Sequence, residues 1–186
     1  MPDEPTPQIS TALAGLAARS AATGPVESGP DESCGDFGLS IARDGTWFHR
    51  GTPIGRLGLV KLFARVLRRE ADGSYWLVTP YERGTIDVAD APFVAVDVDF
   101  AGEGASQTVI LRTNLDETVA LGPAHPLRVT ELPDGARIPY VMIGRGLEAR
   151  IARAPFYRLV ERAVEAPGGG LGVWSQGAFF ELGPAA

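Results

Sequence analysis

The sequence of 186 residues contains a single cysteine, two histidines and one lysine, and each scarcity excludes a class of site. Because Cys34 has no second cysteine to pair with, the chain forms no intramolecular disulfide and no cysteine-rich metal knot. Neither His49 nor His125 has a metal-ligating residue four positions later, which argues against a zinc site of histidine and cysteine. No apolar run approaches the ~20 residues that a transmembrane helix needs.

The beginning of the chain, MPDEPTPQIS, is acidic and rich in proline, unlike a secretory signal. With the single cysteine, this predicts a cytoplasmic protein with no membrane partner. The net charge is −6, of which residues 1–36 contribute −5 through six acids and one base, so the other 150 residues carry only −1. A nearly neutral body lacks the positive surface of a general nucleic-acid-binding protein.

Three stretches resemble catalytic or nucleotide-binding motifs but lack a residue or an element that each motif requires. The stretch GVWSQG from Gly172 resembles a nucleophile elbow, but Val173 stands where that motif needs glycine. The glycines from Gly168 follow a predicted helix rather than a strand, so they do not form a dinucleotide fingerprint. Lys61 follows Val60 instead of glycine, which excludes a P-loop. The sequence therefore indicates no catalytic residue, cofactor or metal, and we favour a protein that is not an enzyme.

Composition and periodicity divide the chain into three parts. Residues 1–35 predict an N-terminal helix followed by a flexible acidic linker, because Thr6-Pro7 resembles a helix start and GPVESGPDESCG is turn-forming. Residues 36–90 predict a first half with a hairpin around Asp44-Gly45, a helix starting at Thr52-Pro53 and two more strands. In that helix Lys61, Arg65, Arg68 and Arg69 form a basic stripe. Residues 91–186 predict a second half of antiparallel strands, a helix from Pro155 and a closing hairpin.

The two halves show signs of an internal duplication. Pro53, Arg56 and Leu57 recur as Pro155, Arg158 and Leu159 at one offset of 102 residues, each set lying between a strand and a helix. We therefore expect an α+β fold of two related halves, each with antiparallel strands packed on one helix as a hairpin–helix–hairpin unit. A groove between such halves is a common location for ligands. Chance is the alternative explanation, because the shared residues are few.

Candidate binding residues are arginines, aromatics and polar residues at strand ends. Arginine offers forked donors to phosphate or carboxylate, and an aromatic ring offers a stacking face. Segments 79–84 and 113–116 each place polar groups at the end of an apolar strand, where binding sites are often found, although turn formation explains the same residues. The predicted ligand contacts are Trp47, Arg56, Tyr81, Arg83, Thr113, Asn114 and Arg158.

Several stretches together resemble one bacterial family. The first runs from DGTWFHRGTPIGR to ADAPFVAV, and RTNLDETVALGPAHPLRV, PYVMIGRGLEARI and GVWSQGAFFELG follow. Over about Cys34 to Leu182 the chain resembles the family called domain of unknown function 1285. The resemblance implies an α+β fold of two related halves, the second superficially like a pleckstrin-homology barrel. It also implies a ligand-binding or signalling role, with a nucleotide-like ligand between the halves.

Three functions fit these observations. The first is a module that holds a small anionic ligand, of nucleotide-like chemistry in the family's case, between the two halves. The second is a protein-interaction domain that uses an exposed apolar patch or an open strand edge to bind a protein partner. The third is a metal-dependent hydrolase that uses Glu82, Asp97 or Asp99. We favour the first, because no stretch marks a reaction centre.

Overall fold

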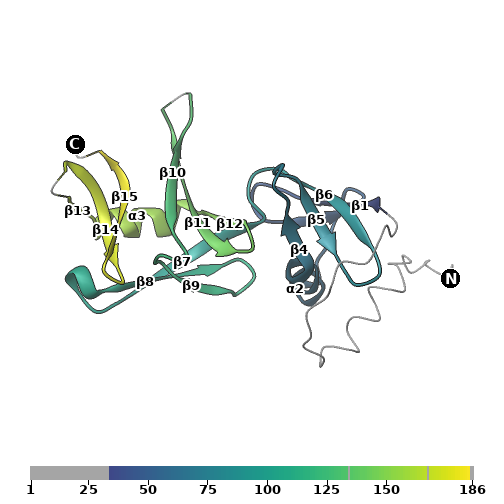
Figure 1. Cartoon of the computed structure of the whole chain (residues 1–186), viewed down its shortest axis with the longest axis horizontal. Helices are drawn as coiled ribbons and strands as arrows, with labels where there is room; N and C mark the ends of the chain where they lie inside the picture. The colour runs from purple at the N-terminus through teal and green to yellow at the C-terminus, as the bar shows by residue number, and fades with distance from the viewer. Residues whose placement is uncertain (1–33, 134, 167, 185–186) are drawn as a thin grey trace.

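The computed structural model describes residues 34–133, 135–166 and 168–184. The predicted N-terminal helix and all but the last two residues of the predicted linker lie outside these ranges. The described part is a mixed α+β structure of two six-stranded sheets, a smaller three-stranded sheet and few helices (Figure 1). Among the described residues, no helix is both long and apolar enough to span a membrane.

The N-terminal half consists of one six-stranded sheet and a helix. Its sheet has the order β3-β2-β1-β6-β5-β4, in which β1 and β6 are parallel and the other neighbours antiparallel. The elements are β1 (Cys34–Ile41), β2 (Trp47–His49), β3 (Thr52–Pro53), α2 (Leu57–Val66), β4 (Leu67–Arg69), β5 (Tyr75–Val78) and β6 (Arg83–Val88). Val60, Phe63 and Ala64 form the buried face of α2.

The C-terminal half repeats this sheet and adds a hairpin layer. Its six-stranded sheet has the order β10-β11-β12-β7-β8-β9, with β12 and β7 parallel at the centre. The elements are β7 (Phe93–Ala101), the short 3-10 helix η1 (Gly104–Ser106), β8 (Thr108–Thr113), β9 (Thr118–Ala120), β10 (Leu127–Glu131), β11 (Arg137–Gly144) and β12 (Leu147–Ile151). Then follow α3 (Arg153–Glu161), β13 (Val164–Glu165), β14 (Gly170–Ser175) and β15 (Ala178–Pro184), whose strands form the sheet at the left of Figure 1.

The two large sheets have the same topology. Each consists of two three-stranded antiparallel meanders, and in each the first strand of the first meander pairs in parallel with the last strand of the second. Strands β1 to β6 therefore correspond in order to β7 to β12. The helices do not correspond in the same way, because α2 lies between the third and fourth strands and α3 follows the sixth. The structural repeat therefore relates the strands of the two sheets. The sequence offset of 102 residues, in contrast, related the two helices.

Two predicted helix boundaries were wrong. Thr52-Pro53 form the short strand β3 instead of a helix start, because Phe48 pairs with Pro53 and the Ile54 N–H donates to the Trp47 carbonyl at 2.8 Å. At the other end, the helix stops at Val66, and Leu67–Arg69 pair with β5. The predicted basic stripe is therefore divided between two elements, with Lys61 and Arg65 on the helix and Arg69 on a strand.

Candidate functional site

Charged side chains gather on one face of the C-terminal sheet. Arg128 on β10 lies opposite Tyr140 on β11, which in turn lies opposite Arg150 on β12. Residues opposite one another in antiparallel strands share a face, and so do residues two positions apart on one strand. Glu148 therefore belongs to the same row. This row alternates along its strands with fully buried neighbours such as Val141 and Ala149.

The N-terminal half contributes the facing side chains. Arg69 on β4 and Tyr75 on β5 are cross-strand neighbours, and the Arg69 guanidinium lies 3.8 Å from the Glu148 carboxylate. Asp90 lies just before β7, on the connection between the halves, and Arg43 lies in the turn after β1. We call these eight residues the junction cluster: Arg43, Arg69, Tyr75, Asp90, Arg128, Tyr140, Glu148 and Arg150.

Two carboxylates organise the junction cluster. Arg128 forms a bidentate pair with Glu148 along one edge of its guanidinium, with Nε–Oε1 at 2.5 Å and Nη2–Oε2 at 2.7 Å, while its Nη1 donates to the Thr130 hydroxyl at 2.5 Å. The Tyr140 hydroxyl donates to Asp90 Oδ1 at 2.7 Å, while Arg150 and Arg43 approach Asp90 Oδ2 at 3.5 and 4.0 Å. The guanidinium of Arg128 also lies over the Tyr140 ring, 4.3 Å from its centre. Between the halves, the cluster's contacts are the ion pairs of Arg69 with Glu148 at 3.8 Å and of Arg43 with Asp90 at 4.0 Å.

Burial divides the junction cluster into acids inside and arginines outside. The side chains of Glu148 and Asp90 are 10% and 14% exposed, whereas those of the four arginines are 30% to 69% exposed. Four arginines and two acids leave an excess charge of two positive units. The exposed guanidinium edges keep donors that the two carboxylates do not use, and such donors suit an anion.

The surroundings shift the pKa values of three groups in the cluster. Burial and the hydrogen bond to Asp90 raise the pKa of Tyr140 to about 12, so its hydroxyl stays protonated and donates. Burial also raises the pKa of Tyr75, although Arg69 opposes this. The hydrogen bonds to Glu148 raise the pKa of Arg128. Both tyrosines are therefore neutral at neutral pH, and Arg128 is a permanent cation.

Two further side chains, Asn114 and Arg145, also join the halves. Asn114 accepts a hydrogen bond from the Val94 N–H at 3.0 Å and donates to the carbonyl of Gly45 at 3.3 Å. Arg145, at the β11–β12 turn, donates to the carbonyls of Arg65 and Ala64 at the end of α2. A cation at a helix C-terminus interacts favourably with the helix dipole.

A separate row of ion pairs, which we call the ion-pair ladder, crosses from α2 to α3. Lys61 contacts Asp116 at 2.7 Å, Asp116 contacts Arg112 at 3.7 Å, and Arg112 contacts Asp97 at 3.0 Å. Arg158 completes the row with 2.7 Å to Asp97. Its acids are 36% to 56% exposed, and its charges nearly balance. The Arg112 and Lys61 side chains lower the pKa values of Asp97 and Asp116 respectively.

The seven predicted contact residues lie in several places. Among the described residues, no hydrogen bond, ion pair or ring contact joins any two of their side chains. Trp47 is 1% exposed and stacks on Phe63 in the core, so its ring offers no free face at the surface. Arg158 belongs to the ion-pair ladder, and Arg56 is an exposed residue just before α2.

The remaining predicted residues serve turns or local contacts. Thr113 is fully buried, and its hydroxyl accepts from the backbone N–H groups of Leu115 and Glu117. Arg83 lies over the Trp76 ring at 4.2 Å and pairs with Glu70 at 3.6 Å. Tyr81 is 58% exposed in a turn that Thr79 organises through its hydroxyl. Asn114 is the one predicted residue whose side chain joins the two halves.

The residues of the junction cluster were not among the predicted ligand contacts, although the sequence contains part of the pattern that marks them. Glu148 is an acid within the strand LEARI, whose other positions are largely apolar, and a buried acid needs a partner. Arg128 and Tyr140 likewise alternate with apolar residues. The pairing of these strands, which brings the residues together, depends on contacts distant in the sequence.

Comparisons with known proteins establish the family. Residues 24–91 match the model described as "Domain of unknown function (DUF1285), N-terminal domain", and residues 92–182 match "Protein of unknown function (DUF1285), C-terminal domain". No curated protein matches the chain. The chain belongs to the DUF1285 family, which confirms the resemblance.

Two solved structures are similar to the chain. A crystal structure of a DUF1285 family protein from Silicibacter pomeroyi DSS-3 is 41% identical with a TM-score of 0.79, over 92% of this chain and 94% of that chain. A DUF1285 family protein from Shewanella baltica OS155 is 27% identical with a TM-score of 0.53, over 67% of this chain and 91% of that chain. The first likeness supports the two-part α+β architecture.

Proposed function

We propose that the protein is a binding module for a small anionic ligand and that the junction cluster holds this ligand. The observation that carries the proposal is the excess of two positive charges on four partly exposed arginines at the boundary between the halves. This keeps the predicted location between the halves but moves the contacts to other residues. Ligand binding to both halves would favour one relative arrangement, as a signalling role requires.

The chemistry of the cluster favours phosphate or carboxylate groups. The buried carboxylates hold the guanidinium groups in place, and an arranged arginine binds an oxyanion through parallel N–H donors. The tyrosine rings already face guanidinium groups, Arg128 over Tyr140 and Arg69 over Tyr75. A nucleotide-like ligand would therefore be recognised mainly through its phosphates.

Thermal denaturation with phosphate, AMP and citrate tests the proposal. A ligand at ten times its dissociation constant stabilises the native state by about 1.4 kcal/mol, which a melting curve resolves. The double variant Arg43→Gln/Arg150→Gln should lose this stabilisation, because both side chains face the outside of the cluster. The matched control Arg158→Gln, from the nearly balanced ladder, should keep it. The absence of any stabilisation by millimolar anions would contradict the proposal.

The origin of the fold by duplication is also a proposal. We infer a duplicated ancestral unit from the identical strand order of the two large sheets, with one helix added at a different point in each half. A likeness of the second half to a pleckstrin-homology barrel, and a cytoplasmic location, stay predictions from the sequence. The hydrolase alternative is not favoured, because Asp97 is held by Arg112 and Arg158.

A further inference from the structure

Helix α2 is apolar on more of its surface than it buries. Of its ten residues only Lys61 and Arg65 are charged, and one face of the helix is buried in the core. Beside that face lie Leu59, Leu62 and Val66, whose spacing of three and four residues places them in one row. These three side chains are half-buried, whereas a helix that is apolar on most sides is usually covered on most sides. This row, here called the α2 strip, therefore lacks part of its cover among the described residues.

Residues 7–22, here called the N-terminal segment, contain a row that matches the α2 strip. Ile9, Leu13 and Leu16 recur at the spacing of one helix face, and most other residues of the segment are small. Both rows extend over eight residues. Three large apolar side chains do not stabilise an isolated helix of this length, because such helices gain most of their stability by packing an apolar face on another surface. The N-terminal segment therefore needs a partner surface of the length that α2 offers.

The place where the N-terminal segment joins the described structure favours α2. The chain enters at Cys34, the first residue of β1, which belongs to the sheet of the N-terminal half. In Figure 1, α2 lies at the lower edge of this half, beside that sheet. The eleven residues between the segment and Cys34 extend to about 40 Å, whereas a sheet of six strands is about 24 Å wide. The α2 strip is therefore within reach in the same molecule.

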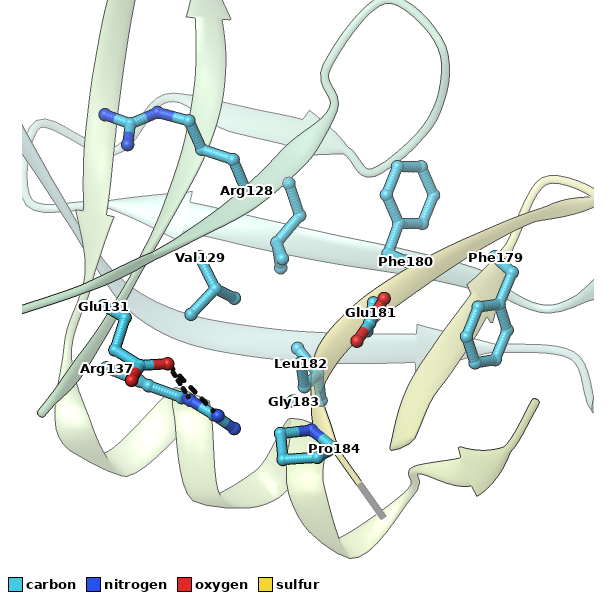
Figure 2. Close-up of a pocket in the computed structure, with 11 residues that line it drawn as sticks. Arg128, Val129, Glu131, Arg137, Phe179, Phe180, Glu181, Leu182, Gly183 and Pro184 are labelled. Carbon is cyan, nitrogen blue, oxygen red and sulfur yellow. Dashed lines mark hydrogen bonds and ion pairs between the residues drawn. The ribbon is translucent and has the colours of Figure 1, made fainter. Parts of the chain in front are cut away.

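Two other surfaces fit the N-terminal segment less well. Tyr157 and Val160 on α3 are 52% and 36% exposed, and a groove of about 420 Å³ lies between β10 and β15 (Figure 2). Both surfaces belong to the C-terminal half, whose α3 and β15 lie away from β1 in Figure 1. Figure 2 shows Glu131, Arg137 and Glu181 at the groove, and covering charged side chains with an apolar row is unfavourable.

The likeness to the protein from Silicibacter pomeroyi includes part of the chain before Cys34. It covers 92% of this chain, whereas the described residues are about four fifths of it. Because few of the undescribed residues follow Cys34, about half of residues 1–33 must have counterparts in that crystal structure. The corresponding segment of the relative therefore has a defined position, as a docked helix does.

We infer that the N-terminal segment forms an amphipathic helix that packs along the α2 strip of the same molecule. The two apolar rows would interlock as helix surfaces do when the ridges of one fill the grooves of the other. Because Arg145 of the C-terminal half caps the end of α2, the segment and that half would both contact this helix. The α2 strip is separate from the junction cluster, so the inference does not depend on the anion site proposed above.

Limited digestion of the full-length protein with trypsin tests the inference, because Arg19 is the one trypsin site before Arg43. The rate of cleavage at Arg19 follows the population in which the segment has left its docked position. Leu13→Gln/Leu16→Gln should release residues 1–19 about tenfold faster than the wild type, since two apolar side chains no longer pack on α2. The matched control Ala14→Gln/Ala18→Gln changes the opposite face of the predicted helix and should cleave at the wild-type rate. Equal rates for all three proteins, measured by mass spectrometry, would overturn the inference.

A pair of variants on α2 locates the docking surface. Leu62→Gln removes the middle of the α2 strip and should accelerate cleavage at Arg19 about tenfold as well. Leu57→Gln is the matched control, because Leu57 belongs to the same helix and is 47% exposed but lies outside the strip. Melting curves verify that both variants are folded. The same acceleration by both variants, or by neither, would overturn the inference.

Photo-crosslinking gives a readout that does not depend on proteolysis. The photoreactive residue p-benzoylphenylalanine in place of Ala17, beside the apolar row, should crosslink to a peptide from residues 57–66 within a monomer. Crosslinks to α3 or to the groove between β10 and β15 would place the segment elsewhere and overturn the inference. A crosslinked dimer would also overturn it, because the segment would then dock on a second copy of the chain.

Discussion

The junction cluster and the ion-pair ladder both join the two halves through arginine or lysine and carboxylates, but they differ in burial and charge balance. In the junction cluster the acids are 10% and 14% exposed and the arginines outnumber them by two. In the ladder the acids are 36% and 56% exposed, and three cations meet two acids. Exposed ion pairs contribute little because water and salt screen them. We therefore expect the junction cluster to hold the halves together and the ladder to be dispensable.

The largest effect should follow from removing Glu148. Glu148→Ala leaves Arg128 without its two hydrogen bonds and Arg69 without its ion pair, so we expect a loss of about 3 kcal/mol in the free energy of unfolding. Urea denaturation followed by tryptophan fluorescence measures the loss. Glu131→Ala is the matched control, because its partner Arg137 lies at an exposed end of the sheet. A loss no greater than that of the control would remove the distinction between the two regions.

A second prediction concerns the uncharged link between the halves. Asn114→Ala leaves the Val94 N–H without an acceptor, and we expect a loss of about 2 kcal/mol in the free energy of unfolding. Asn114→Asp keeps that acceptor but loses the donor to Gly45, so it should cost less. Gly45 has a φ of +84° and lies against the Asn114 amide, which leaves no room for a side chain. Equal losses for the two substitutions would show that the hydrogen bond from the Val94 N–H adds nothing to the free energy of unfolding.

The sequence predicted the type of fold better than the site. The alternating apolar residues of β1, β7 and β8 and the turn at Asp44-Gly45 are local signals, and the two halves followed from them. The end of α2 was not predictable in this way, because Leu67 fits the apolar face of a helix and also the buried side of a strand. Its pairing with Leu77 decides the outcome, and this pairing is a tertiary contact.

The residues of the site were difficult to predict for a related reason. Arginine and aromatic residues occur throughout the chain, and their chemistry alone does not show which ones meet. Thr113 was chosen because segment 113–116 places polar groups at a strand end, and Thr79 begins the other such segment, 79–84. Both threonines serve turns through their hydroxyls. Glu148 meets Arg69 of β4, and Asp90 meets Arg43 of the turn after β1 in the other half. Only the topology contains that information.

A third prediction tests the buried tyrosine at the junction. Tyr140→Phe removes the hydrogen bond to Asp90, and we expect a loss of about 1.5 kcal/mol in the free energy of unfolding at neutral pH. The pKa of Tyr140 is about 12 in the folded state against 10.0 for the free side chain. The stabilisation is therefore complete below pH 10 and lost as the pH rises towards 12.

Denaturation between pH 9 and pH 12 measures this alkaline loss, and absorbance at 295 nm follows the ionisation of the tyrosines. The wild type should lose stability over this range more steeply than Tyr140→Phe does. Tyr157→Phe is the control, because Tyr157 is 52% exposed on α3. A wild type and a Tyr140→Phe variant with parallel pH profiles would contradict the assignment of the raised pKa.

The smallest effect should come from the ion-pair ladder, the more exposed of the two regions that join the halves. The pKa values of Asp97 and Asp116 are lowered in the folded state, so any stabilisation by these carboxylates is present above their unfolded pKa and disappears as the pH falls below it. Because both acids are exposed, we expect Asp97→Asn and Asp116→Asn to shift the melting temperature no more than raising the salt concentration shifts that of the wild type. The acid limb of the stability profile should likewise change little in the double variant. A loss comparable to that of Glu148→Ala would mean that the ladder, despite its exposure, also holds the two halves together.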